Sequence, residues 1–100
     1  MLVEFVVASG RTERGRSWVR IDPGGAVEAR GEGAAPDPAD VAFTATPADA
    51  AALGNGDLDL SVGFIRGQVK VAGDPGALLH VLPLVSGRRP VVALGELLPA

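Results

Sequence analysis

The sequence predicts a mixed α+β domain, in which a mostly antiparallel sheet of five strands carries its helices on one face. Three observations support this prediction. Short apolar stretches, separated by turns that contain glycine and proline, fill the N-terminal third of the chain. Further along, a capping residue followed by proline occurs at two places, and each pair predicts a helix start. A strand-like stretch lies between these starts. The length of 100 residues is typical of one domain, so we expect a single domain over residues 1–100.

The first predicted strand, Leu2–Ala8, is rich in Val and Phe, which is typical of a strand that is buried on both faces. The segment Ser9–Arg16 contains glycines and several charges, and it is expected to form a turn or a flexible hairpin tip. The second strand, Ser17–Asp22, alternates, with Val19 and Ile21 on the same face.

A turn at Pro23–Gly25 follows, because proline presets φ and glycine supplies a positive φ. The returning strand is predicted over Ala26–Arg30, with Val27 and Ala29 facing the core. The short connection predicts close antiparallel pairing of the two strands. Residues 31–39 have no hydrophobic period and contain two prolines, so they form a loop.

The next strand, Asp40–Thr46, leads directly into a helix. Thr46 is a favourable N-cap, Pro47 suits the first helical position, and Asp49 follows the cap by three residues, as in a capping box. The Gly-Asn-Gly run at 54–56 predicts the end of this helix.

A second short helix is expected to be capped by Asp57 and to end at Gly63 or Gly67. Its apolar positions are Leu58, Leu60 and Val62. The fifth strand is predicted over Gln68–Ala72.

The last clear helix begins with Asp74 as its cap and Pro75 at its first position. Pro83 has no N–H to donate to the carbonyl of Leu79, so the helix is predicted to kink or end near Leu82. Its apolar side is expected to consist of Leu78, Leu79, Leu82 and Val85.

Composition excludes several function classes. The formal net charge is −3, which argues against a nucleic-acid partner and against constitutive electrostatic docking on anionic membranes. The absence of cysteine excludes disulfides, thiolate metal sites and cysteine nucleophiles. The N-terminus has no basic region and no apolar run approaches about 20 residues, so we expect no stable membrane insertion and a cytoplasmic location. The Ala, Gly, Pro and Arg usage is typical of a GC-rich bacterial genome.

No constellation for catalysis or cofactor binding can be assembled. His80 has no neighbouring carboxylates with metal-site spacing, and the calcium-like run 55–59 is followed by Leu60 where the required glycine would stand. Gly31-x-Gly33 lacks a third glycine and opens no helix. None of the serines lies in a nucleophile elbow: Ser9, Ser17, Ser61 and Ser86. The sequence therefore predicts no enzyme, no cofactor and no metal.

The most distinctive stretch is Gly67–Asp74, of the form Gly-x-Val-Lys-Val-x-Gly-Asp, which leads into the leucine-rich helix. It follows the strand at Asp40–Phe43, the helix end at Leu53–Gly54 and the apolar stretch Leu58–Ile65. This order resembles the C-terminal half of the sterol carrier protein 2 (SCP2) domain over about residues 40–86. The resemblance implies a cavity for an apolar ligand (a sterol, a fatty acid or an acyl thioester) that is bound or transferred without chemistry.

The apolar fraction is 47% and the aromatic fraction 4%, so an aliphatic core that leaves an internal cavity is plausible. Arg66 and Lys70 could meet an acidic headgroup, or they are solvated surface charges. The alternative to a cavity is an ordinary packed core. The candidate lipid-binding residues are Phe43, Leu60, Phe64, Ile65, Val69, Val71, Leu78, Leu79, Leu82 and Val85.

One departure from the family concerns the N-terminus. SCP2 domains ordinarily begin with a helix that packs over the sheet, whereas this chain starts on a strand. Either the apolar tail Arg88–Ala100 or a second subunit is expected to cover that face, and we predict a homodimer. Trp18 is then an interface anchor or a lone packed ring. Because SCP2 domains also occur appended to enzymes, the alternative function is a non-catalytic, dimerising accessory module with a filled core.

Overall fold

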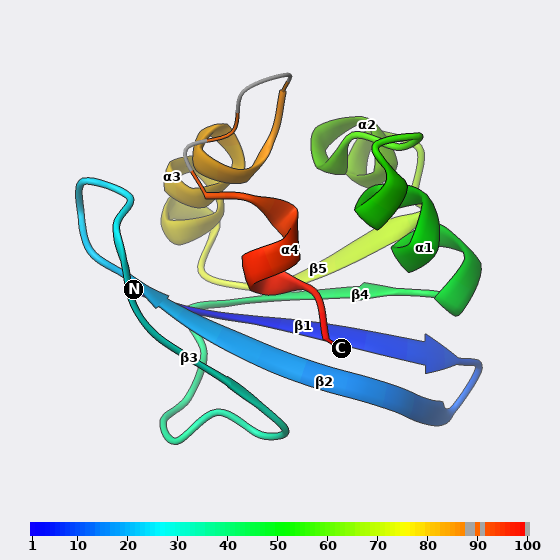
Figure 1. Cartoon of the computed structure of the whole chain (residues 1–100), viewed down its shortest axis with the longest axis horizontal. Helices are drawn as coiled ribbons and strands as arrows, with labels where there is room; N and C mark the ends of the chain where they lie inside the picture. Colours follow the sequence, from blue (N-terminus) through cyan, green and yellow to red (C-terminus); the bar gives the residue numbers. More distant parts are fainter. Residues whose placement is uncertain (88–89, 91, 100) are drawn as a thin grey trace.

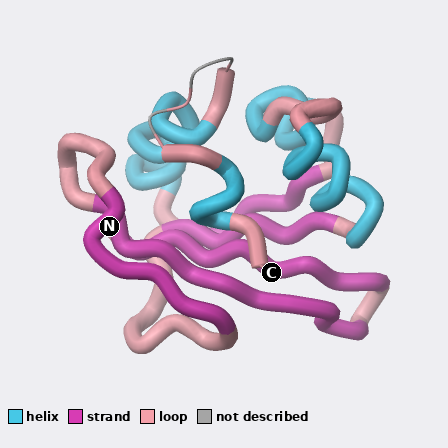
Figure 2. The backbone as a smooth tube through the Cα atoms, in the orientation of Figure 1, coloured by secondary structure: helices cyan, strands magenta, loops and turns pink. Residues whose placement is uncertain are grey.

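A computed structural model describes residues 1–87, 90 and 92–99. Within them, five strands form one sheet in the order β3-β2-β1-β4-β5, and the helices form a second layer over one of its faces (Figures 1 and 2). The predicted α+β class is thereby confirmed. The strands are β1 (Leu2–Ser9), β2 (Thr12–Ile21), β3 (Val27–Glu32), β4 (Val41–Ala45) and β5 (Val69–Gly73). The helices are α1 (Pro47–Asn55), α2 (Leu60–Ile65), α3 (Pro75–Val85) and α4 (Leu94–Leu97).

The sheet is mostly antiparallel, as predicted. Its one parallel pair within the described chain is β1 with β4, in which Phe5 lies opposite Phe43. The two rings stack with their centroids 6.3 Å apart. Both side chains are fully buried on the face that the helices cover, together with Val3 and Val41. Alternation along each strand therefore directs one set of side chains into a single core.

The hairpin between β1 and β2 is tighter than the sequence indicates. The segment expected as a flexible tip reverses at Gly10, whose φ is +59°, and β2 already begins at Thr12. Arg16 stabilises this extension by binding Glu13 at 2.8 Å and Glu4 at 3.1 Å. The extension is not regular. The register shifts between Val7 and Ala8, because Val7 pairs with residue 15 and Ala8 with residue 13.

The predicted pairing of β2 with β3 is confirmed, but two details differ. Strand β3 continues to Glu32, because its backbone pairs with β2 as far as Ser17. Val27 does not face the core and is 37% exposed. It lies at a register shift next to Ile21 on the edge strand, and a bulge of this kind breaks the alternation of faces.

Two helix caps agree with the prediction. The Thr46 hydroxyl accepts the amide N–H of Asp49 at 3.2 Å, and an Asp74 carboxylate oxygen accepts the amide N–H of Ala77 at 3.1 Å. The cap of α2 is Asp59, so the prediction of Asp57 is wrong. Both carboxylate oxygens of Asp59 accept hydrogen bonds. Oδ2 accepts the N–H of Val62 at 3.3 Å, and Oδ1 accepts the N–H of Gly87 at 2.7 Å.

Helix α3 does not end near Leu82 but runs through Pro83 to Val85. Pro83 is exposed, as is Leu79, so the carbonyl that loses its partner lies on the solvent side of the helix. The expected apolar side is also rotated. Val81 and Val85 are the buried residues of α3, whereas Leu79 is 74% exposed.

The tail docks, as predicted, over the part that the structure describes. Val92 and Leu97 are almost completely buried, and α4 packs on β1 and β2 from the same side as the other helices. The Ser17 hydroxyl donates to the carbonyl of Leu97, and Arg30 binds Glu96 at 2.7 Å. Residues 88, 89, 91 and 100, which belong to the predicted tail, lie outside the described residues.

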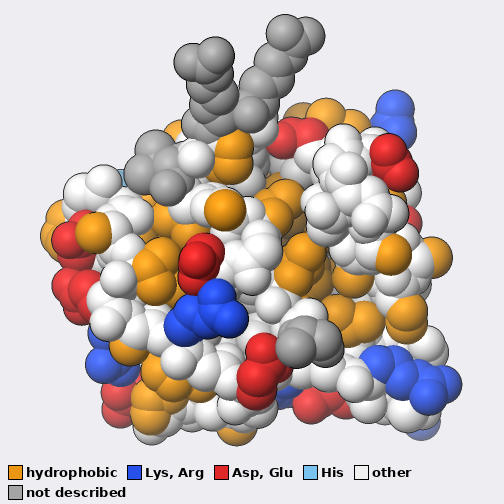
Figure 3. Space-filling view, viewed as in Figure 1, with side chains coloured by type: hydrophobic (Ala, Val, Ile, Leu, Met, Phe, Trp, Pro, Cys, Tyr) orange, Lys and Arg blue, Asp and Glu red, His pale blue; other side chains and the backbone are white. Residues whose placement is uncertain are grey.

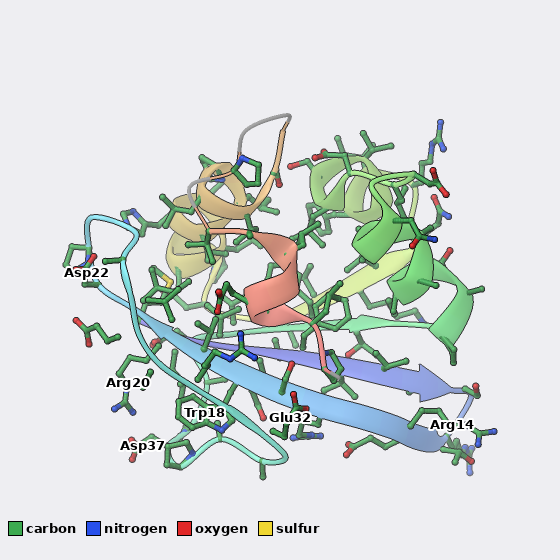
Figure 4. All side chains as sticks on the ribbon, in the orientation of Figure 1. Arg14, Trp18, Arg20, Asp22, Glu32 and Asp37 are labelled. Atoms are coloured by element: carbon green, nitrogen blue, oxygen red, sulfur yellow. The ribbon has the colours of Figure 1, made fainter. Side chains whose placement is uncertain are left out.

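The opposite face of the sheet is partly covered by the loop at 33–40, which passes below β2 (Figure 1). Arg20 binds Asp37 of this loop at 3.0 Å (Figure 4). Trp18 packs on Gly31 of β3, where a Cβ would lie 2.8 Å from the indole ring. This contact favours the packed-ring interpretation of Trp18 over the interface anchor.

Gly73 is required where β5 ends. Its φ is +120°, and a Cβ would lie 2.3 Å from the carbonyl oxygen of Asp40, which accepts the Asp74 N–H. We expect Gly73→Ala to lower the free energy of unfolding by about 3 kcal/mol. The control, Gly33→Ala, has a φ of +84° but no neighbour within 4 Å, and should lose only about 1 kcal/mol. Equal losses in urea denaturation would contradict this assignment.

Leu97 should carry most of the stabilisation that the tail provides, because its side chain is fully buried against the sheet. We expect Leu97→Ala to lower the free energy of unfolding by about 3 kcal/mol. Leu79→Ala, at a side chain that is 74% exposed, should change it by less than about 0.5 kcal/mol. Deletion of residues 90–100 should lower the melting temperature further. An unchanged melting curve for Leu97→Ala would show that the tail does not stabilise the fold.

Candidate functional site

The larger of two apolar grooves lies in the helical layer and has a volume of about 650 Å³. We call it the wide groove. Its walls are the end of α1, the start of α2, the end of α3 and the segment that leads into α4. Its apolar lining residues include Leu53, Leu58, Val62, Val85, Ala93 and Leu94. Hydrophobic side chains also gather in the hollowed centre of the face shown in Figure 3.

The second groove, of about 440 Å³, lies between α1 and the β1–β2 hairpin. We call it the hairpin groove. Its apolar lining residues include Val7, Pro47, Ala50, Ala51, Leu98 and Pro99. Gly54 and Asn55 line both grooves. The two grooves therefore share part of their wall at the end of α1, where a Cδ atom of Leu98 lies 3.5 Å from the position that a Cβ of Gly54 would occupy.

A smaller hollow of about 250 Å³ is polar. It lies where β4 ends and β5 begins, and its polar lining residues include Thr46, Asp49, Gln68 and Lys70. The Gln68 amide donates to Asp49 at 3.0 Å, whereas its buried Oε1 has no hydrogen-bond partner in the described protein. More polar side chains line this hollow than line either of the two grooves.

The residues predicted to bind a lipid fall into three groups. Phe43, Leu60, Val69 and Val85 are fully buried, and Val85 also lines the wide groove. Val71, Leu78 and Leu82 are partly buried against the core. Phe64, Ile65 and Leu79 are 37%, 81% and 74% exposed. Lipid binding by these residues stays a prediction, and the structure brings Val85 alone among them to either groove.

Sequence reasoning did not find most of the groove walls. Leu94, Leu98 and Pro99 belong to a tail whose position cannot be read from local pattern. The Gly54–Gly56 run was interpreted as a helix end, which it is, because Gly56 has a φ of +80° and caps α1. Gly54 and Asn55 of this run also line both grooves.

The cations divide into paired and unpaired groups. The hydrogen bond that Arg16 donates to Glu13 raises the pKa of Arg16, and the one that Arg30 donates to Glu96 raises the pKa of Arg30. Arg66 is exposed and lines none of the three hollows, whereas Lys70 lines the polar one. Arg14 lines the hairpin groove and forms no ion pair with the described residues. Among the cations that the structure describes, it is the one that lines an apolar groove.

Two further properties of the described residues concern metal binding and membrane crossing. They contain no group of three or more His, Asp or Glu side chains that could hold a metal ion. None of their helices has both the length and the hydrophobicity that a bilayer crossing requires.

Comparison with solved structures gives the same fold. Sterol carrier protein 2-like 2 from Aedes aegypti is 13% identical, with a TM-score of 0.64 over 84% of this chain and 72% of that one. Its palmitated form, solved by NMR, is 16% identical, with a TM-score of 0.58 over 87% and 76%. The sec-alkylsulfatase Pisa1 from Pseudomonas sp. is 22% identical, with a TM-score of 0.56 over 97% of this chain but 14% of that one. No curated protein matches the sequence.

A family model settles the relationship. The model of the SCP-2 sterol transfer family matches residues 4–86, which is most of the chain. The match begins well before residue 40, where the motifs that suggested the resemblance start, so it includes most of β1 and all of β2 and β3. The chain therefore belongs to the SCP-2 sterol transfer family.

Proposed function

We propose that the chain binds or transfers an apolar ligand (a sterol, a fatty acid or an acyl thioester) in the wide groove and makes no covalent bond to it. The observation that carries this proposal is the groove itself. Its volume of about 650 Å³ lies within the range of about 300–1,000 Å³ that is typical of ligand pockets. Its walls are mainly aliphatic, so they offer contact area to a lipid and few groups for chemistry.

Simple energetics support an acyl chain as the ligand. Each buried CH₂ group contributes about 0.8 kcal/mol, so ten of them contribute about 8 kcal/mol before the cost of association. The palmitated Aedes aegypti relative shares the fold, which favours a ligand of this class. As part of the same proposal, we place the activity in the cytoplasm. The ten sequence-predicted lipid-binding residues stay part of the proposal, and Val85 is the one of them that lines the wide groove.

A second candidate function is a non-catalytic accessory module that acts as a homodimer. The filling of the helical layer by the tail favours it, because Val92 and Leu97 occupy space over the sheet that a ligand could otherwise use. The similarity to the sec-alkylsulfatase Pisa1 also favours the accessory module. Nearly the whole of this chain matches 14% of that enzyme, so a domain of this fold occurs there as a small part of an enzyme.

The test combines native mass spectrometry with one groove-filling variant. Ala93 is exposed and lines the wide groove, so Ala93→Trp should place a ring in it. Ala48 is exposed on α1 and lines neither groove, so Ala48→Trp is the matched control. We expect palmitate or cholesterol adducts on the wild type and the control, and an affinity about tenfold lower for Ala93→Trp, as if two CH₂ groups were displaced.

A wild type that carries no lipid after purification and takes up neither palmitate nor cholesterol would overturn the carrier proposal. A dimer observed under those conditions would support the accessory module instead.

A further inference from the structure

The position of Arg14 depends on an irregularity of the sheet. Between β1 and β2, Val7 pairs with Gly15 and Ala8 pairs with Glu13, so Arg14 is the extra residue of a β-bulge. Strict alternation from Gly15 would turn Arg14 towards the face opposite the helices. A bulge can re-aim a side chain, and Arg14 instead lines the hairpin groove on the helical side. Figure 4 shows it near the hairpin end of β2, below α1.

The hairpin groove has the chemistry of a slot for an amphiphile. Arg14 is the one charged side chain among its lining residues, and Asn55 is the one other polar side chain. The remaining walls are aliphatic, proline or glycine. Gly15 allows Pro99 to pack closely on β2, because a Cβ at Gly15 would lie 3.4 Å from the Cβ of Pro99. An apolar slot with a single cation is complementary to an acyl chain that ends in an anion.

The charge of Arg14 is available to a ligand. Arg16, two residues away, is engaged by Glu4 and Glu13, and Arg20 is engaged by Asp37. Glu13 is the acidic residue next to Arg14 in sequence, and it forms an ion pair with Arg16 at 2.8 Å. No acidic residue lines the hairpin groove, so a carboxylate that entered it would meet no like charge on its described walls.

We propose that the hairpin groove binds the carboxylate end of a fatty acid, with Arg14 as its recognition residue. A guanidinium donates two parallel hydrogen bonds to the two oxygens of a carboxylate, and the opposite charges strengthen them. A sterol hydroxyl and an ester carry no negative charge, so neither can replace the carboxylate in this pairing. The acyl chain then extends along α1, past Gly54 and Leu98, towards the wide groove. This inference rests on the proposed function and narrows its ligand class from apolar lipids to fatty acids.

The experiment compares palmitate with hexadecanol, which has the same chain length and a neutral head, by calorimetric titration. The variants are Arg14→Gln, Arg14→Lys and, as the control, Arg11→Gln, an exposed position of the same hairpin that lines neither groove. We expect the wild type to prefer palmitate by about tenfold and Arg14→Gln to abolish that preference without changing hexadecanol affinity. Arg14→Lys should restore part of the preference, and Arg11→Gln should keep all of it.

Two further readouts separate the causes. Added salt should weaken palmitate binding to the wild type but not to Arg14→Gln, because an exposed ion pair is screened. Acetate should not bind, which would distinguish a lipid carboxylate from a free one. Equal affinities for palmitate and hexadecanol, unchanged by Arg14→Gln, would overturn this inference and leave the carrier function standing. Failure of both ligands to bind would overturn both.

Discussion

The parallel pairing of β1 with β4 joins the two halves of the chain. It places Phe5 opposite Phe43, and the stacked rings lie at the centre of the buried face. Strand β1 also pairs with β2 on its other side, so it is the strand that carries the hairpin and receives the later elements. Helix α1 begins two residues after β4, and its position over the sheet therefore follows from this pairing. Because α1 lines both grooves, the position of their walls also depends on this pairing.

The tail completes the helical layer. Helix α4 packs on β1 and β2, and Leu97 contributes a fully buried side chain whose backbone carbonyl accepts the Ser17 hydroxyl. Because Leu94 lines the wide groove and Leu98 the hairpin groove, the same four-residue helix and its flank separate the two spaces. The tail thus contributes both to the buried core and to the walls of the two grooves. A cavity in this chain consists of what the tail leaves unfilled.

Local chemistry could be predicted from the sequence, and long-range geometry could not. Thr46 and Asp74 were identified as caps because a side chain and a nearby amide are sufficient to make one. Asp59 was missed in favour of Asp57, since both precede the same apolar run and only tertiary packing selects the start. The bulge at Arg14 depends on how two strands pair, and the tail's place depends on the sheet it covers. For that reason the lining of the grooves, unlike the fold class, required coordinates.

The carboxylate of Asp59 links two elements that face each other across the wide groove. One oxygen caps α2 through Val62, and the other accepts the N–H of Gly87 just beyond α3. Widening the groove at this point must break one of these bonds, and a lost cap costs about 1 kcal/mol. The contact between α2 and the end of α3 and the cap of α2 therefore depend on the same carboxylate. A bulky guest that forced α2 and the end of α3 apart would therefore strain the first turn of α2, whose Val62 lines the same groove.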